Sequence, residues 1–140
     1  MRVMAVDYGD ARTGVAVSDA TATIVGDAWV LQSKSREDVA AAISAEAATR
    51  GVSVIVVGFP RNMDGTAGPR AEVCEQFAAL LRGRCEARVA LWDERLTTVD
   101  AHRILTDAGK FGKKRKKTID AVAASLILEG YLSSGQFRNG

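Results

Sequence analysis

The heptapeptide VSVIVVG, residues 52–58, constrains the fold more than any other segment of the chain. Successive side chains of a strand point to opposite faces of a sheet, and here both sets are apolar. Strands of this kind lie in parallel sheets that helices cover on both sides. The segment therefore predicts a buried parallel strand within an α/β domain.

Four other segments have the composition of strands. Residues 2–7 are apolar and β-favouring, and the turn GDAR connects them to a second strand over residues 13–19. These two strands are expected to form a hairpin. Further strands are predicted over residues 23–31 and 88–94.

Helix patterns fill most of the remaining chain. Ser35 is expected to cap a helix that buries Val39, Ile43 and Ala47, with Gly51 just past its end. The other predicted helices run over residues 70–81, from Thr97 or Thr98 to Gly109, and from Thr118 to about Leu132.

The resulting order, βββαβαβαα, predicts one α/β domain over residues 1–140 with a five-stranded mixed sheet flanked by helices. A three-strand meander comes first, and right-handed parallel crossovers add the later strands. Ligands of such sheets bind at the carboxyl ends of the parallel strands. Residues that end these strands are therefore the first candidates for a functional site.

Composition narrows the class of protein. A hydrophobic fraction of 47% with 26% charged residues is that of an ordinary soluble globular protein. No apolar run approaches the roughly 18 residues that cross a bilayer, and the N-terminal run is too short for a signal peptide, so a cytoplasmic location is expected. Cys74 and Cys85 are expected to be reduced thiols, because so few cysteines and one histidine support neither a disulfide framework nor a zinc site.

The net charge of +2 conceals an uneven distribution. The segment KFGKKRKK, residues 110–117, holds six of the 19 lysines and arginines and no acid. The rest of the chain carries 13 cations against 17 acids, a balance of −4. A mildly acidic body with one dense basic segment favours a local contact with a polyanion.

Carboxylates are expected to converge at one edge of the sheet. Asp7 ends the first strand, and Asp93 and Glu94 end residues 88–94 at the same edge if the two strands are parallel neighbours. Alternation allows one of Asp93 and Glu94 to point toward Asp7 and does not say which. Asp120 lies in the first turn of the last helix, on one face with Ala124 and Ile127.

Clustered carboxylates repel one another unless a cation neutralises them. Magnesium prefers oxygen ligands and often bridges to substrate phosphate, and two such ions can activate water and stabilise the leaving oxygen of a phosphodiester. Each acid also has a structural reading: Asp7 as a turn cap, Asp120 as a helix N-terminal acid, Asp93 and Glu94 as an exposed strand end.

Four motifs in order carry a resemblance to a known family: DYGDARTGVAVSD, VGFPRNMDGTAGP, WDERLTT and IDAVAASLILEGYL. They resemble the YqgF family of RNase H-like proteins, also called RuvX, over about residues 3–133. The resemblance implies an RNase H-like fold and a nuclease dependent on Mg²⁺ or Mn²⁺ that matures the 5′ end of pre-16S rRNA. It also implies that Asp7, Glu94 and Asp120 are the catalytic, metal-holding acids. Asp10 stands at a position that this family varies.

Several cationic and polar residues are candidates for contact with nucleic acid. Arg12 could hold a phosphate or pair with Asp10 or Asp19, and the loop 61–68 could clamp a substrate or form an ordered turn. Trp92 is expected in the core and His102 on the surface of a helix. The candidate contacts are Arg12, Arg61, Asn62, Arg95, Lys113, Lys114, Arg115, Lys116 and Lys117.

Other functions remain open from the sequence. The same chemistry could act on branched DNA at Holliday junctions, or the chain could be a low-turnover binding factor in ribosome assembly. DYG followed by TG also resembles the phosphate-binding hairpin of sugar kinases and actin-like ATPases, which need two such domains. A monomer or weak homodimer is expected, with nucleic acid as the partner and no membrane contact.

Overall fold

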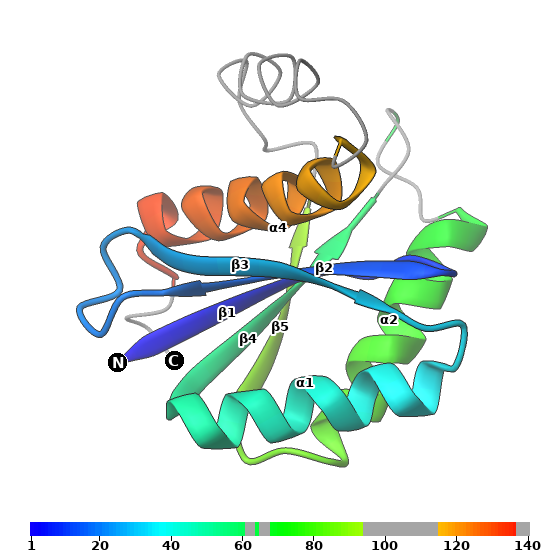
Figure 1. The fold of residues 1–140 in the computed structure, drawn as a ribbon, viewed down its shortest axis with the longest axis horizontal. Helices are drawn as coiled ribbons and strands as arrows, with labels where there is room; N and C mark the ends of the chain where they lie inside the picture. The colour runs from blue at the N-terminus through cyan, green and yellow to red at the C-terminus, as the bar shows by residue number, and fades with distance from the viewer. Residues whose placement is uncertain (61–63, 65–67, 94–114, 137–140) are drawn as a thin grey trace.

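The computed structural model describes residues 1–60, 64, 68–93 and 115–136, and side chains of the last range from residue 121 onward. Five strands form one sheet in the order β3-β2-β1-β4-β5 (Figure 1). β1 pairs antiparallel with β2 and parallel with β4, β2 pairs antiparallel with β3, and β4 pairs parallel with β5. The strands are β1 (Arg2–Asp7), β2 (Arg12–Ser18), β3 (Val25–Gln32), β4 (Val52–Phe59) and β5 (Arg88–Asp93). The predicted meander followed by parallel crossovers is confirmed.

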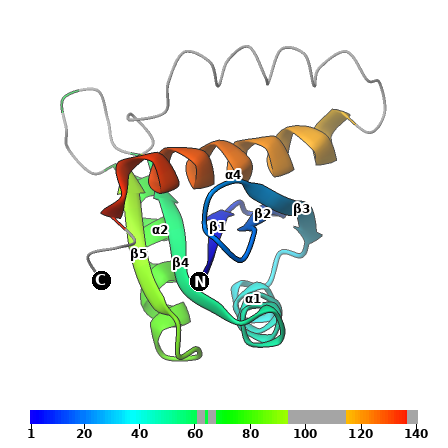
Figure 2. The ribbon, with the colours of Figure 1, turned by 90° about the vertical axis from the view of Figure 1, so that its left-hand side faces the viewer.

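Helices cover both faces of this sheet, as Figure 2 shows. α1 (Arg36–Arg50) and α2 (Pro69–Arg82) lie on one face, and α4 (Arg115–Ser134) lies on the other. The helix predicted from Thr97 or Thr98 to Gly109 lies outside the described residues, as does His102.

The start predicted for the last helix is wrong. The sequence predicts a helix from Thr118, but α4 begins at Arg115. Arginine and lysine are good helix formers, so the end of the basic segment continues the helix instead of preceding it. Three cations therefore occupy its first turn.

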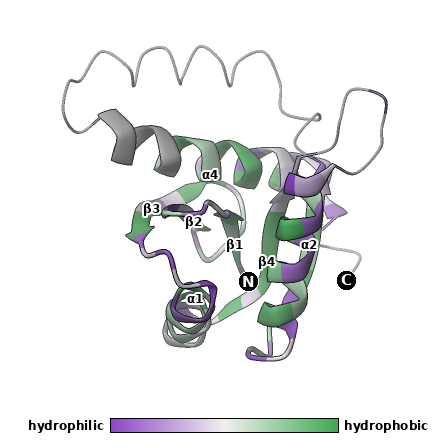
Figure 3. Ribbon diagram, turned by 90° about the vertical axis from the view of Figure 1, so that its right-hand side faces the viewer, coloured by the Kyte–Doolittle hydropathy of each residue, from purple (hydrophilic) through white to green (hydrophobic). Residues whose placement is uncertain are grey.

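Two hydrophobic layers share the central strands between them. Ile55 and Val57 of β4 pack toward α1 and α2, whereas Val54 and Val56 pack toward α4. All four are at most 3% exposed. Apolar colour on β4 and on the sheet-facing side of α2 is visible in Figure 3. This two-sided burial is what the run VSVIVVG predicts.

Local signals set the ends of α1 as expected. The Ser35 side chain accepts a hydrogen bond of 3.2 Å from the backbone N–H of Asp38, which satisfies one free donor of the first turn. Gly51 follows the helix with φ of 66°, a left-handed conformation that favours glycine.

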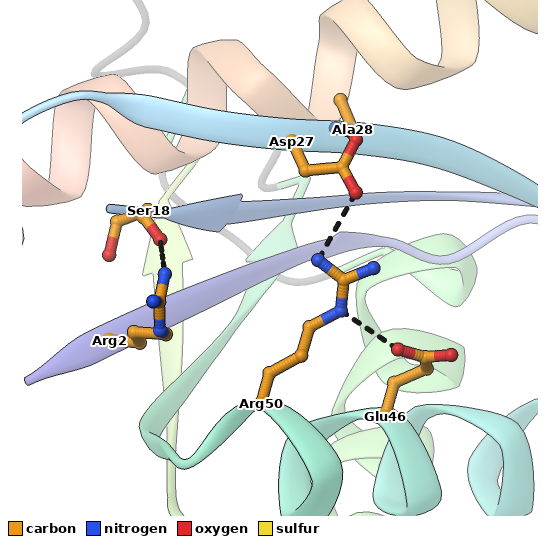
Figure 4. Close-up of polar contacts among 6 residues, drawn as sticks. All are labelled: Arg2, Ser18, Asp27, Ala28, Glu46 and Arg50. Atoms are coloured by element: carbon orange, nitrogen blue, oxygen red, sulfur yellow. Dashed lines mark hydrogen bonds and ion pairs between the residues drawn. The ribbon is translucent and has the colours of Figure 1, made fainter. Parts of the chain in front are cut away.

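Arg50 ties α1 to the edge strand β3. Its guanidinium lies 3.1 Å from the Asp27 carboxylate and 2.8 Å from that of Glu46 (Figure 4). It also lies 4.4 Å from the centre of the Trp29 ring, a cation–π contact. These contacts cover part of β3, whose outer edge has no neighbouring strand in the sheet.

Both cysteines are free, as predicted. Cys74 is buried in the core, and burial raises the pKa of the half-buried Cys85 thiol. Among the helices that the structure describes, none combines the length and apolarity needed to cross a membrane.

Asp19 organises the turn between β2 and β3. Its carboxylate accepts hydrogen bonds from the Thr21 hydroxyl and from the backbone N–H groups of Thr23 at 2.8 Å and Ile24 at 3.2 Å. These bonds, the Thr21 hydroxyl first, lower the pKa of Asp19 from its ordinary value of 3.8 to about 2. The charged form of Asp19 is therefore the one that stabilises the turn.

We expect Asp19→Asn to lower the melting temperature at pH 7. A carboxylate with a depressed pKa stabilises the fold above about pH 3.8, and this contribution is lost as pH falls through about 2. The difference in melting temperature from the wild type should therefore shrink between pH 4 and pH 2 in a calorimetric series. Glu75→Gln, which removes an exposed carboxylate on α2, is the matched control. A difference that stays constant across this range would contradict the assignment.

Candidate functional site

Asp7 is the last residue of β1 and lies at the carboxyl edge of the sheet. Val3 and Ala5, four and two residues earlier, pack toward α4, so alternation places Asp7 on the α4 face. Its partner across the β1–β2 ladder is Gly14, on the same face as Ala16. Gly14 is buried and has no side chain, so no side chain of β2 stands beside the Asp7 carboxylate at this level.

The turn after Asp7 is tight. The backbone N–H of Gly9 donates to the hydroxyl of the fully buried Thr13. A Cβ atom added at Gly9 would lie 2.2 Å from the carbonyl oxygen of Arg12, closer than any real contact. Glycine is therefore required here by close approach of the two backbone segments.

Helix α2 holds the other side of this turn. The Tyr8 ring stacks on Phe77, with centroids 4.2 Å apart. The Arg70 guanidinium donates to the backbone carbonyl of Tyr8 and to the Asp10 carboxylate, the latter at 3.1 Å. Arg70 is not among the site residues predicted from the sequence. A signal was present, since a cation in the first turn of a helix opposes the helix dipole and so suggests another role.

β5 is not a neighbour of β1 in the sheet. Adjacency of these two strands was the condition for placing Asp93 or Glu94 next to Asp7. β4 separates the two strands, so their axes are about 10 Å apart at the usual strand spacing. The condition is therefore not met, because strand order depends on long-range crossovers and not on local pattern. The ladders Val6↔Val57 and Gly58↔Trp92 nevertheless put Asp7, Gly58 and Trp92 at one level.

The two faces of β5 distinguish its terminal residues. Trp92 is 5% exposed and packs on the α4 face against Gly130 and Tyr131, which confirms its predicted core position. Asp93 follows it and therefore lies on the opposite face, the side of α1 and α2. Asp93 and Asp7 do not share a face.

α4 runs across one face of the sheet, and its N-terminal turns lie at the edge where β1 ends (Figure 1). Its last turns lie at the other end, where Glu129, Leu132 and Ser133 border the β2–β3 turn. Ala124, Ile127 and Tyr131 are buried against the sheet. Asp120 lies one turn before Ala124 in the same helix.

The remaining predicted residues divide between described and undescribed segments. Arg12 is the first residue of β2, and Arg115, Lys116 and Lys117 begin α4. An Arg12–Asp19 pair is excluded, because these residues stand at opposite ends of β2, about 20 Å apart in an extended strand. The rest, Arg61, Asn62, Glu94, Arg95, Lys113 and Lys114, lie outside the described residues. Among the side chains that the structure describes, no three His, Cys, Asp or Glu residues gather closely enough to hold a metal ion.

Two solved proteins with the same architecture are Holliday junction resolvases. T. thermophilus RuvC, in complex with a Holliday junction substrate, matches with a TM-score of 0.63 over 96% of both chains at 13% identity. The fowlpox virus Holliday junction resolvase matches with a TM-score of 0.55 over 96% of this chain and 99% of the viral one, at 13% identity. The chain thus has the RuvC-type, RNase H-like fold.

Comparison with sequence relatives identifies the family within this fold. The family described as "RuvX: Holliday junction resolvase" matches residues 1–134. A Halothermothrix orenii protein named "Putative pre-16S rRNA nuclease" is 45% identical over 95% of each chain. A Geobacillus kaustophilus protein of the same name is 46% identical over 96% of this chain and 99% of its own length. The chain belongs to the RuvX family.

We expect Gly9→Ala to destabilise the protein by about 1–3 kcal/mol, the usual cost of forcing an extra methyl group into a filled site. The turn must open to relieve the contact with the Arg12 carbonyl. Urea denaturation measures this change. Gly83→Ala is the control, because its added Cβ would meet Leu80 at an ordinary 3.6 Å. Equal stability of the two variants would contradict the close approach at Gly9.

Proposed function

We propose that this chain is a metal-dependent endonuclease that cleaves phosphodiester bonds of structured RNA, and that it processes the 5′ end of pre-16S rRNA in the cytoplasm. The observation that carries the proposal is the position of Asp7 on the α4 face at the carboxyl edge of the sheet. The names of the relatives from Halothermothrix orenii and Geobacillus kaustophilus support the RNA substrate.

Asp7, Glu94 and Asp120 would hold the metal. Asp93 lies on the face away from Asp7. Alternation therefore favours Glu94 over Asp93 as the acid that holds the metal together with Asp7. Asp120 precedes the fully buried Ala124 by four residues, a spacing that puts both on one face of α4. Three carboxylates suit a hard cation such as Mg²⁺ or Mn²⁺ better than Zn²⁺, which favours nitrogen and sulfur ligands.

The bound metal would supply charge neutralisation and an activated water for attack on phosphorus. The chain itself provides a rigid mount for Asp7 at the end of a buried strand. On the neighbouring strands it has glycines at this level, Gly14 and Gly58, which are buried and lie on the same face to either side of Asp7. No side chain of β2 or β4 therefore stands beside the carboxylate at the position that a phosphate group would take.

Cations near this edge would position the nucleic acid. Arg115, Lys116 and Lys117 begin α4, whose N-terminus adds partial positive charge from the helix dipole. Lys113 and Lys114 precede them, and Arg12 begins β2 after the Asp7 turn. Contacts with phosphates through these groups, and through Arg61, Asn62 and Arg95, would be independent of base sequence.

A second candidate substrate is branched DNA. The likeness in fold to RuvC solved with a Holliday junction substrate favours it. Cleavage of labelled precursor rRNA and of four-way DNA junctions, measured side by side, separates the two substrates. Binding to either without metal-dependent cleavage would instead indicate a low-turnover assembly factor.

We expect Asp7→Asn, Glu94→Gln and Asp120→Asn each to lower metal-dependent cleavage by more than about 100-fold. Loss of even an outer-shell partner of a metal site typically costs 10–100-fold, and these residues are proposed as direct ligands. Initial rates with Mg²⁺ and with Mn²⁺ measure the effect. Asp93→Asn is the matched control, since Asp93 lies on the other face, and it should cleave at close to the wild-type rate. Equal losses in Asp93→Asn and Glu94→Gln would contradict the assignment of Glu94.

Replacing residues 113–117 with serine should weaken nucleic-acid binding and flatten its salt dependence. Each lost phosphate contact reduces the slope of log K against log salt by about 0.7–0.9. Fluorescence anisotropy between 50 and 300 mM salt measures the slope. The control replaces Arg36 and Arg84, exposed cations on the α1–α2 side, with serine. This variant should have the same salt slope as the wild type. An unaltered slope in the serine variant would remove the basic segment as a contact.

A further inference from the structure

The contacts between Arg70 and the turn after Asp7 have no part in the chemistry assigned above. One guanidinium makes three contacts there. It donates to the backbone carbonyl of Tyr8, donates to the Asp10 carboxylate at 3.1 Å, and lies 5.7 Å from the centre of the Tyr8 ring. Such a set requires the planar fork of arginine, because a lysine ammonium is a single point charge on a flexible stem.

These contacts hold the backbone next to Asp7 from the side opposite its carboxylate. Tyr8 is 7% exposed, and its ring stacks on Phe77 of α2. Its carbonyl belongs to the peptide group that leads into Gly9, whose N–H is bonded to the buried Thr13. The peptide group after Tyr8 is therefore held at its carbonyl by Arg70 and at its N–H by Thr13.

Arg70 also balances the charge of Asp10. The Asp10 side chain is 90% exposed and stands three residues after Asp7 in the same turn. An unpaired carboxylate at this place would repel an approaching phosphate backbone. The side chain of Arg70 is 41% exposed, and an ion pair this open contributes little to stability. The Arg70–Asp10 pair is thus better suited to positioning the turn and neutralising Asp10 than to stabilising the fold.

We propose that Arg70 is a positioning residue of the nuclease site: it fixes the turn that follows Asp7 and neutralises Asp10 beside the path of the substrate. The inference rests on the proposed function. Two effects follow, and they differ in what they change. Loss of position weakens metal binding and kcat, whereas loss of neutralisation raises KM for the nucleic acid.

The experiment compares Arg70→Ala, Arg70→Lys and the double variant Arg70→Ala/Asp10→Asn with the wild type. Mn²⁺ affinity is measured by electron paramagnetic resonance without substrate, kcat and KM by cleavage, and the melting temperature by calorimetry. Arg84→Ala is the matched control, because it removes an equally open arginine–carboxylate pair, with Glu37, just beyond the other end of α2.

We expect Arg70→Ala to weaken Mn²⁺ binding and lower kcat by about 10–100-fold, the usual effect of losing an outer-shell partner. KM should rise as well. Arg70→Lys and the double variant should recover the wild-type KM, because each restores the charge balance, but neither should recover kcat or Mn²⁺ affinity. Arg84→Ala should leave all three values unchanged.

Wild-type Mn²⁺ affinity and kcat in Arg70→Ala would overturn the inference, and so would equal losses in Arg84→Ala. If Arg70→Ala does not fold, Arg70→Lys carries the test, and wild-type Mn²⁺ affinity and kcat in that variant overturn it. A wild-type protein that cleaves with metal while Arg70→Ala is unaffected refutes the inference alone. A wild-type protein that neither binds Mn²⁺ nor cleaves refutes the proposed function, and this inference with it.

Discussion

Burial of β1 and β4 on both faces is the constraint on which the rest of the structure depends. Val3 and Val6 of β1 are fully buried on opposite sides, and Val56 and Val57 of β4 repeat the arrangement. Each strand needs helices above and below, so α1 and α2 occupy one face and α4 the other. Because the strands are parallel, the same burial fixes the edge of the sheet at which their carboxyl ends emerge. Asp7 is the last residue of β1 and lies at that edge.

An acid at the end of such a strand carries a cost that its surroundings reduce. Burial disfavours a charged carboxylate unless opposite charge or hydrogen bonds compensate for lost water. Asp7 lies at the boundary and is partly exposed, with glycines on the strands to either side at its level. No side chain of β2 or β4 therefore flanks the half-buried carboxylate, and in the proposed nuclease site a cation and a phosphate would bind at this position.

Much of this arrangement could be predicted from the sequence because its signals are local. Two-sided apolarity identified β4 to within one residue, and Ser35 and Gly51 marked the ends of α1. The features that could not be predicted from the sequence depend on contacts between residues far apart in the chain. The position of β4 between β1 and β5 depends on crossover packing, and Arg70 reaches the Asp7 turn across 60 residues of chain. The predicted start of α4 was wrong for a local reason: Thr118 is compatible with the interior of a helix as well as with its beginning.

The beginning of α4 shows a conflict between stability and the proposed function. Cations at Arg115, Lys116 and Lys117 oppose the helix dipole in its first turn, and they also repel one another. A fold selected for stability alone would place acids there, as α1 does with Glu37 and Asp38 in its own first turn. A bound polyanion reverses the balance, because each phosphate is attracted both by the cations and by the dipole that they oppose. In the proposed complex the unfavourable placement would therefore become favourable, which is the difference in free energy that a nucleic-acid-binding surface requires.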